Sequence, residues 1–81
     1  MNFTLYSDVI LLRDLPEDNV YAGDIDTVVE KHNIPGLETG YSVEFFDMIG
    51  NTVGIVTLPM SCFRLPTCAD RPAIRLMANI A

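Results

Sequence analysis

Prolines and glycines divide this chain into short pieces, and that division limits the folds it can adopt. Pro16, Pro35, Pro59 and Pro66 interrupt the sequence, with Gly, Asn and Asp turn residues between them. Turn signals therefore recur roughly every 8–12 residues, a spacing typical of small all-β proteins. We predict an all-β fold, a small barrel of four or five antiparallel strands, because a closed sheet has no free edges.

The chain has 81 residues, of which 49% are apolar, and this is enough for one domain with one core. We expect the barrel over residues 1–65 and a C-terminal tail over residues 66–81. The predicted strands are centred on 9–13 and span 25–32, 41–46 and 52–58, with a helical turn or closing strand at 61–65. A helix competes for the first segment because Asp8 could cap it, but Pro16 would stop it within two turns.

The clearest pattern is a hairpin. Tyr41, Val43 and Phe45 alternate with Ser42 and Glu44, so one face of that strand is expected to be buried and the other wet. In the partner strand, a regular alternation places Val53, Ile55 and Thr57 on the buried face. This register leaves three apolar side chains on the outer face, and we predict that they form a binding patch: Phe46, Val56 and Leu58.

The tail is a candidate cover for this patch. Its last stretch permits a short helix with Ile74, Met77 and Ala78 on one face, although such a helix needs a surface to dock on. Residues 1–61 carry 2 − 10 = −8 charges, whereas residues 62–81 carry 3 − 1 = +2. Arg71 and Arg75 are therefore expected to be drawn to an acidic barrel. The barrel could be the tail's own or that of a second copy, and a different protein could also cover the patch.

Charge and cysteine content exclude several functions. A net charge of −6 disfavours nucleic acids and anionic membranes as partners. The longest aliphatic run, residues 9–12, is far too short to cross a bilayer, and no signal peptide is recognisable, so we expect a cytoplasmic protein. Cys62 and Cys68 are expected to be reduced and semi-buried, and we predict neither a metal nor a cofactor.

Four blocks of sequence resemble a known family. They are Tyr6–Glu17, Gly23–Glu30, Tyr41–Phe45 and Gly50–Thr52, and in this order they are similar to a bacterial family called domain of unknown function 4926. The resemblance covers about residues 4–65. It implies an SH3-like barrel and no activity, and it implies a glycine where this chain has Asp26.

Catalytic signals are weak. His32 is the single histidine, and no nucleophile elbow or phosphate-binding loop is present. Asp24 and Asp26 lie two residues apart, and the favoured interpretation is that Asp24 caps a turn while Asp26 lies on a wet face. We therefore predict a non-enzymatic protein–protein interaction module that associates with itself as a homodimer or binds another protein. The alternative is a small-molecule or metal-binding barrel around Asp24, Asp26 and His32.

Overall fold

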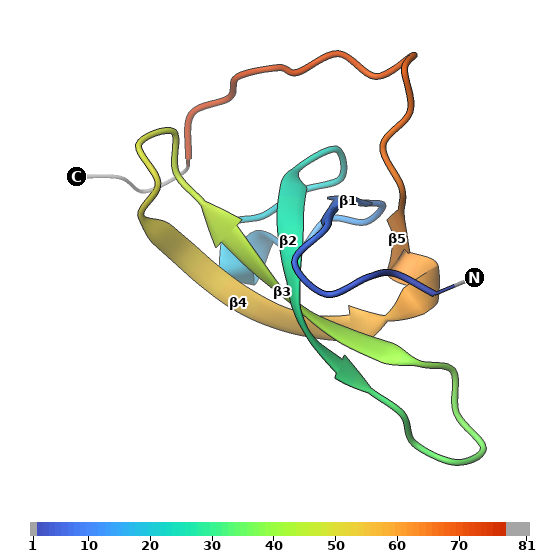
Figure 1. The fold of residues 1–81 in the computed structure, drawn as a ribbon. Coiled ribbons are helices and arrows are strands. Elements are labelled where there is room, and N and C mark those ends of the chain that lie inside the picture. Colours follow the sequence, from blue (N-terminus) through green and yellow to red (C-terminus); the bar gives the residue numbers. More distant parts are fainter. Residues whose placement is uncertain (1, 78–81) are drawn as a thin grey trace.

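The computed structural model describes residues 2–77 and shows five antiparallel strands in one strongly curved sheet (Figure 1). The sheet order is β4-β3-β2-β1-β5, so it forms a half-barrel with β4 at one edge and β5 at the other. The elements are β1 (Asp8–Leu11), η1 (Pro16–Asp18), β2 (Ile25–His32), β3 (Gly40–Phe46), β4 (Thr52–Pro59), η2 (Met60–Cys62) and β5 (Phe63–Arg64). The predicted all-β class is confirmed, and within residues 2–77 the helices are single 3₁₀ turns.

The core lies on the concave face of the sheet. Val9 and Leu11 of β1, Val28 of β2 and Val43 of β3 are fully buried. The N-terminal segment closes one end, because the Phe3 ring packs 5.1 Å from the Tyr41 ring. The Phe3 amide donates a 3.0 Å hydrogen bond to the Tyr41 hydroxyl, so this buried N–H has an acceptor.

A β-bulge corrects the predicted register of the hairpin. Phe45 pairs with Gly54 but Phe46 pairs with Thr52, so Val53 is an extra residue in β4. Beyond the bulge every residue of β4 lies one position away from the regular ladder, and a shift of one exchanges the two faces.

The bulge overturns the outer apolar patch. Val56 and Leu58 pair with Val43 and Tyr41 and pack against the core. Their predicted outer position is wrong, and Ile55, 59% exposed, points outward instead. The bulge thus places two aliphatic side chains inside and leaves the hydroxyl of Thr57 on the outer face.

The predicted tail helix is absent from the described residues. Residues 65–77, which we call the strap, run without regular structure from β5 across one end of the barrel (Figure 1). Pro72 removes a backbone donor, and Ile74 is 81% exposed, so this residue of the predicted apolar face has no surface to dock on. Ala78 lies outside the described residues.

Candidate interaction surface

The strap is attached to the barrel at two points. At its start, the Arg64 guanidinium donates to both carboxylate oxygens of Asp70, at 2.9 and 2.6 Å. The Thr67 amide donates to the same carboxylate at 2.6 Å. These hydrogen bonds, together with the charge of Arg64, hold the pKa of Asp70 well below its usual range. The turn that starts the strap is therefore fixed by one ionised carboxylate.

The second attachment is Arg75. Its Nε donates to Asp24 Oδ1 at 3.0 Å, its Nη2 donates to Asp24 Oδ2, and the guanidinium carbon lies 4.6 Å from the centre of the Tyr21 ring. Nη2 also donates to the Asn19 carbonyl at 3.2 Å. A planar guanidinium can make a forked ion pair and stack on an aromatic ring at once, which an ammonium cannot. Arg75 therefore joins the strap to the loop before β2.

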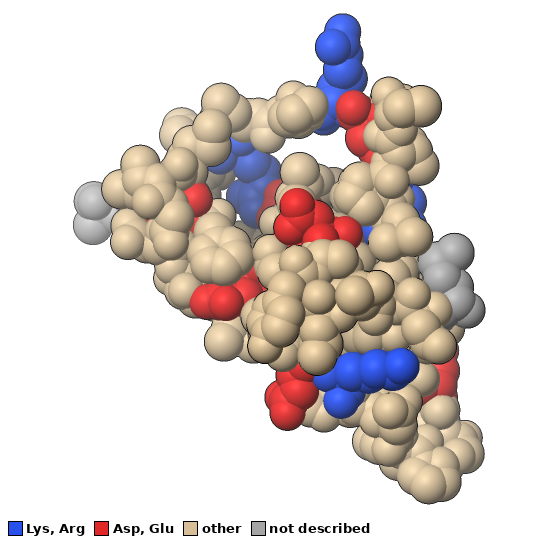
Figure 2. Space-filling view, in the orientation of Figure 1, with Lys and Arg blue, Asp and Glu red and all other residues tan. Residues whose placement is uncertain are grey.

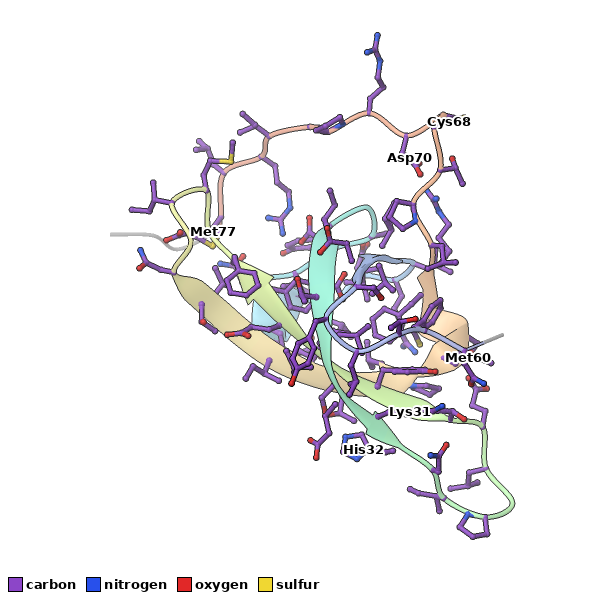
Figure 3. All side chains as sticks on the ribbon, viewed as in Figure 1. Lys31, His32, Met60, Cys68, Asp70 and Met77 are labelled. Atoms are coloured by element: carbon purple, nitrogen blue, oxygen red, sulfur yellow. The ribbon has the colours of Figure 1, made fainter. Side chains whose placement is uncertain are left out.

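The other predicted docking residues of the strap behave differently. Ile74 is exposed and covers nothing, contrary to expectation, and Arg71 is also exposed. Met77 is half-buried at the end of the described strap (Figure 3). Between its two attachments the strap stands clear of the barrel, and Figure 2 shows an opening between the strap and the barrel. The same view shows basic side chains along the strap. Between residues 65 and 76 the strap is thus held mainly by polar contacts.

Asp26 lies inside the barrel, which contradicts its predicted place on a wet face. It pairs with Val9 and precedes Val28 by two residues, so all three side chains share the inner face. The residue is 1% exposed, and neither carboxylate oxygen has a hydrogen-bond partner among residues 2–77. Burial, and then the charges of Asp24 and Asp8, raise the pKa of Asp26 to about 8. At neutral pH this side chain is mostly a neutral acid.

A pattern in the sequence could have located Asp26. Val28 is a β-branched residue suited to the pleated core surface, and the period of two places residue 26 on the same face as residue 28. The resemblance implies glycine at this position, and glycine places no polar side chain in the core. Asp26 is thus a core position occupied by a carboxylic acid.

Asp24, Asp26 and His32 do not form one site. Asp26 and His32 lie six residues apart in β2, about 20 Å along an extended strand, and Asp24 is engaged by Arg75. Among residues 2–77 there is no group of three or more side chains placed to hold a metal ion. The three residues are therefore not brought together, and the alternative of a small-molecule or metal-binding barrel stays a prediction.

His32 belongs to a chain of polar contacts across three strands. Its Nε2 lies 2.9 Å from Ser42 Oγ, and Ser42 Oγ lies 2.7 Å from Thr57 Oγ1. Glu30 approaches the same nitrogen, Nε2, at 3.5 Å. In a catalytic triad the acid and the nucleophile meet opposite ring nitrogens, whereas here Glu30 and Ser42 approach the same nitrogen, so the three residues do not have the geometry of a triad. The contacts connect β2, β3 and β4 on the outer face.

A groove lies beside the hairpin arm, which we define as residues 33–39, the loop between β2 and β3. The groove measures about 790 Å³. Ile34 and Leu37, 55% and 69% exposed, form its apolar side on the arm, and Leu58 and Pro59 form the side on β4. Polar residues that include Lys31, His32 and Glu38 also line it, and Figure 3 shows the first two where the arm leaves the barrel.

The base of the arm is fixed, so the groove has a defined shape. The Glu38 carboxylate accepts a 2.8 Å hydrogen bond from the Ser61 amide, and this bond lowers the pKa of Glu38. The Met60 amide donates to the Thr39 carbonyl at 2.8 Å. We name this depression with its lining residues the arm groove. The sequence indicates a loop here but carries no sign that it would wall a groove.

Comparison with known proteins gives a family and no activity. No curated protein and no solved structure matches the chain. No helix among residues 2–77 is long and apolar enough to cross a membrane. The model of the family described as "Domain of unknown function (DUF4926)" matches residues 5–65, which include every strand and exclude nearly all of the strap. Since that match covers 61 of the 81 residues, the chain belongs to the domain of unknown function 4926 family.

Proposed function

We propose that this chain is a non-catalytic protein-binding module whose arm groove receives an apolar segment of a partner protein. The observation that carries the proposal is the composition of the groove. Ile34 and Leu37 expose apolar side chains in an open depression that Leu58 and Pro59 also line. Exposed apolar walls with a polar rim are typical of surfaces that bind other proteins.

The shape of the groove favours a protein segment over a small molecule. Pockets for small molecules bury most of the ligand surface, and they usually place a few polar groups around it. The arm groove is an open depression, and among its polar lining residues Glu38 already accepts a hydrogen bond from the Ser61 amide. An extended segment can place alternate side chains into such a groove while its other side stays in water.

The cellular setting proposed for this module is the bacterial cytoplasm. The resemblance points to bacteria, and Cys62 and Cys68 are both unpaired, which suits a reducing compartment. The net charge of −6 disfavours binding to nucleic acids and to anionic membranes.

Selection from a displayed library of random peptides tests the proposal and does not require the partner to be identified first. Peptides selected on the wild-type chain should be rich in apolar residues, and Leu37→Asp should weaken their binding about tenfold or more. Ile49→Asp is the matched control, because Ile49 is an equally apolar residue, 85% exposed, at the turn between β3 and β4. The proposal fails if no selected peptide depends on Leu37, or if both variants weaken binding equally.

A further inference from the structure

β4 is an unprotected sheet edge. It is eight residues long and contains no charged residue, and among residues 2–77 it pairs only with β3. Figure 1 shows it along the outer margin of the sheet. Edge strands present unpaired N–H and C=O groups, and proteins usually protect them with charges or by keeping them short, as with the two-residue β5 at the other edge.

The register identifies which backbone groups are free. Pro59 has no N–H, so its pair with Gly40 is of the non-hydrogen-bonded type, and the Met60 amide bonded to the Thr39 carbonyl agrees with this. Because pair types alternate, Leu58, Val56 and Gly54 direct their backbone groups toward β3. Ile55 and Thr57 therefore direct an N–H and a C=O each away from the sheet.

The core is also incompletely covered along this edge. The inward side chains of β3 are fully or almost fully buried, whereas Val53, Val56 and Leu58 of β4 are only partly buried. A Cβ placed at Gly54 would contact nothing within 4 Å, so there is open space on the same inner face. Another strand beside β4 would cover both the backbone groups and these apolar side chains.

We propose that β4 pairs antiparallel with β4 of a second copy of this chain, which joins two half-barrels into one continuous sheet. The two-fold axis passes between the two Val56 residues. Each Ile55 then lies opposite Thr57 of the other copy and exchanges two backbone hydrogen bonds with it, four in all by symmetry. In the same register Leu58 of each copy lies opposite Gly54 of the other, and it fills the open space there.

Charge favours a second copy as the occupant. Every chain carries −6, so two copies repel each other over most of their surfaces. No acid occurs between residues 48 and 69, and β4 lies within that stretch. A basic partner would find no carboxylate in this strand to attract it, and a second copy meets no like charge on β4 itself. The nearby Glu44 of β3, opposite Ile55, accepts a hydrogen bond from Thr52 of its own chain. This interface shares Thr57 and Leu58 with the lining of the arm groove, but it does not depend on the function proposed for that groove.

Sedimentation of the full chain tests the dimer. The 9.0 kDa chain should sediment as a dimer of 2 × 9.0 = 18.0 kDa. Ile55→Lys should raise the dimer dissociation constant roughly tenfold or more, because the two lysines lie near each other across the axis. Mixing Ile55→Lys with Ile55→Glu should restore a dimer, which a merely misfolded variant could not do. Ile74→Lys on the strap, with the same change in chemistry, should leave the dimer intact.

Two further measurements test the register. Gly54→Val should fold normally, since its site is open within one chain, but it should weaken the dimer by displacing Leu58 of the second copy. The amides of Ile55 and Thr57 should exchange with solvent faster as the protein is diluted, whereas those of Val56 and Leu58 should stay protected at every concentration. A wild-type chain that remains monomeric, or an Ile55→Lys variant that dimerises unchanged, overturns the proposal. Leu37→Asp should dimerise normally, so failure of the arm groove would be recognised separately.

Discussion

Asp26→Asn should alter how the stability of the barrel depends on pH. The pKa of Asp26 is raised to about 8 in the folded chain, against 3.8 for the ordinary group. The unfolded chain therefore releases this proton near pH 4, while the folded chain keeps it until about pH 8. Between these values the folded state binds one more proton, so stability falls as pH rises, by about 1.4 kcal/mol per pH unit.

The magnitude at neutral pH follows from the same two values. The difference between pH 7 and 3.8 corresponds to about 4 kcal/mol of lost stability, a large fraction of the total for a domain of this size. Below pH 4 both states are protonated at this site, and it costs nothing further. Above pH 8 both are ionised, and the loss no longer grows. Asparagine resembles the neutral acid in shape but does not titrate, so the variant lacks this slope.

Urea unfolding followed by circular dichroism between pH 4 and 8 measures the effect. The free energy of unfolding of Asp26→Asn minus that of the wild type should rise steadily with pH and level off near pH 8. The slope is the diagnostic quantity, because the amide brings its own buried donors and shifts all values equally. Asp18→Asn, which removes an exposed carboxylate, controls for the changed net charge. A difference that stays flat from pH 4 to 8 would refute the burial of an unpartnered acid.

Three other predictions follow from contacts described above. Tyr41→Phe should lower the free energy of unfolding by about 1–3 kcal/mol in urea titrations, because the buried Phe3 amide loses its acceptor. Arg75→Lys should increase the fast backbone motion of residues 72–77, seen as lower heteronuclear NOE values, while overall stability changes by less than about 1 kcal/mol, since the forked contact with Asp24 is a surface one. NMR titration of the Asp70 carboxyl should find it ionised at pH values where ordinary aspartates are protonated. Because the pKa of Asp70 is lowered, the Arg64 contact stabilises the strap at every pH above the ordinary aspartate pKa. This stabilisation is lost as the pH falls through the lowered pKa of Asp70.

The strands could be predicted from the sequence because local chemistry fixes them. Gly23 and Gly50 adopt positive φ in turns, and Pro59 ends β4, so these glycines and this proline mark the strand boundaries correctly. The second strand, residues 25–32, agrees with β2 to the residue. The face of β4 could not be predicted, because a single bulged residue at Val53 decides it, and no propensity distinguishes a bulged from a regular ladder.

The candidate surfaces are harder to predict than the strands. The arm groove depends on how a loop folds back toward β4, which sequence patterns do not report. The apolar pattern of the strap predicts docking through Ile74, yet the observed attachment depends on one guanidinium that finds a carboxylate 51 residues away. A long-range pair of this kind can be identified only once the fold is known, because many acidic residues of the barrel are equally plausible partners for Arg75.

The extra residue at Val53 also affects how members of this family should be aligned. A homologue lacking one residue between Phe45 and Ile55 would have a regular ladder, yet it could keep the same side chains directed inward. The gap then belongs at Val53 and not in the turn at residues 47–51. An aligner that places the gap beyond residue 55 would compare inward positions with outward ones, and substitution patterns along the edge strand would lose their meaning.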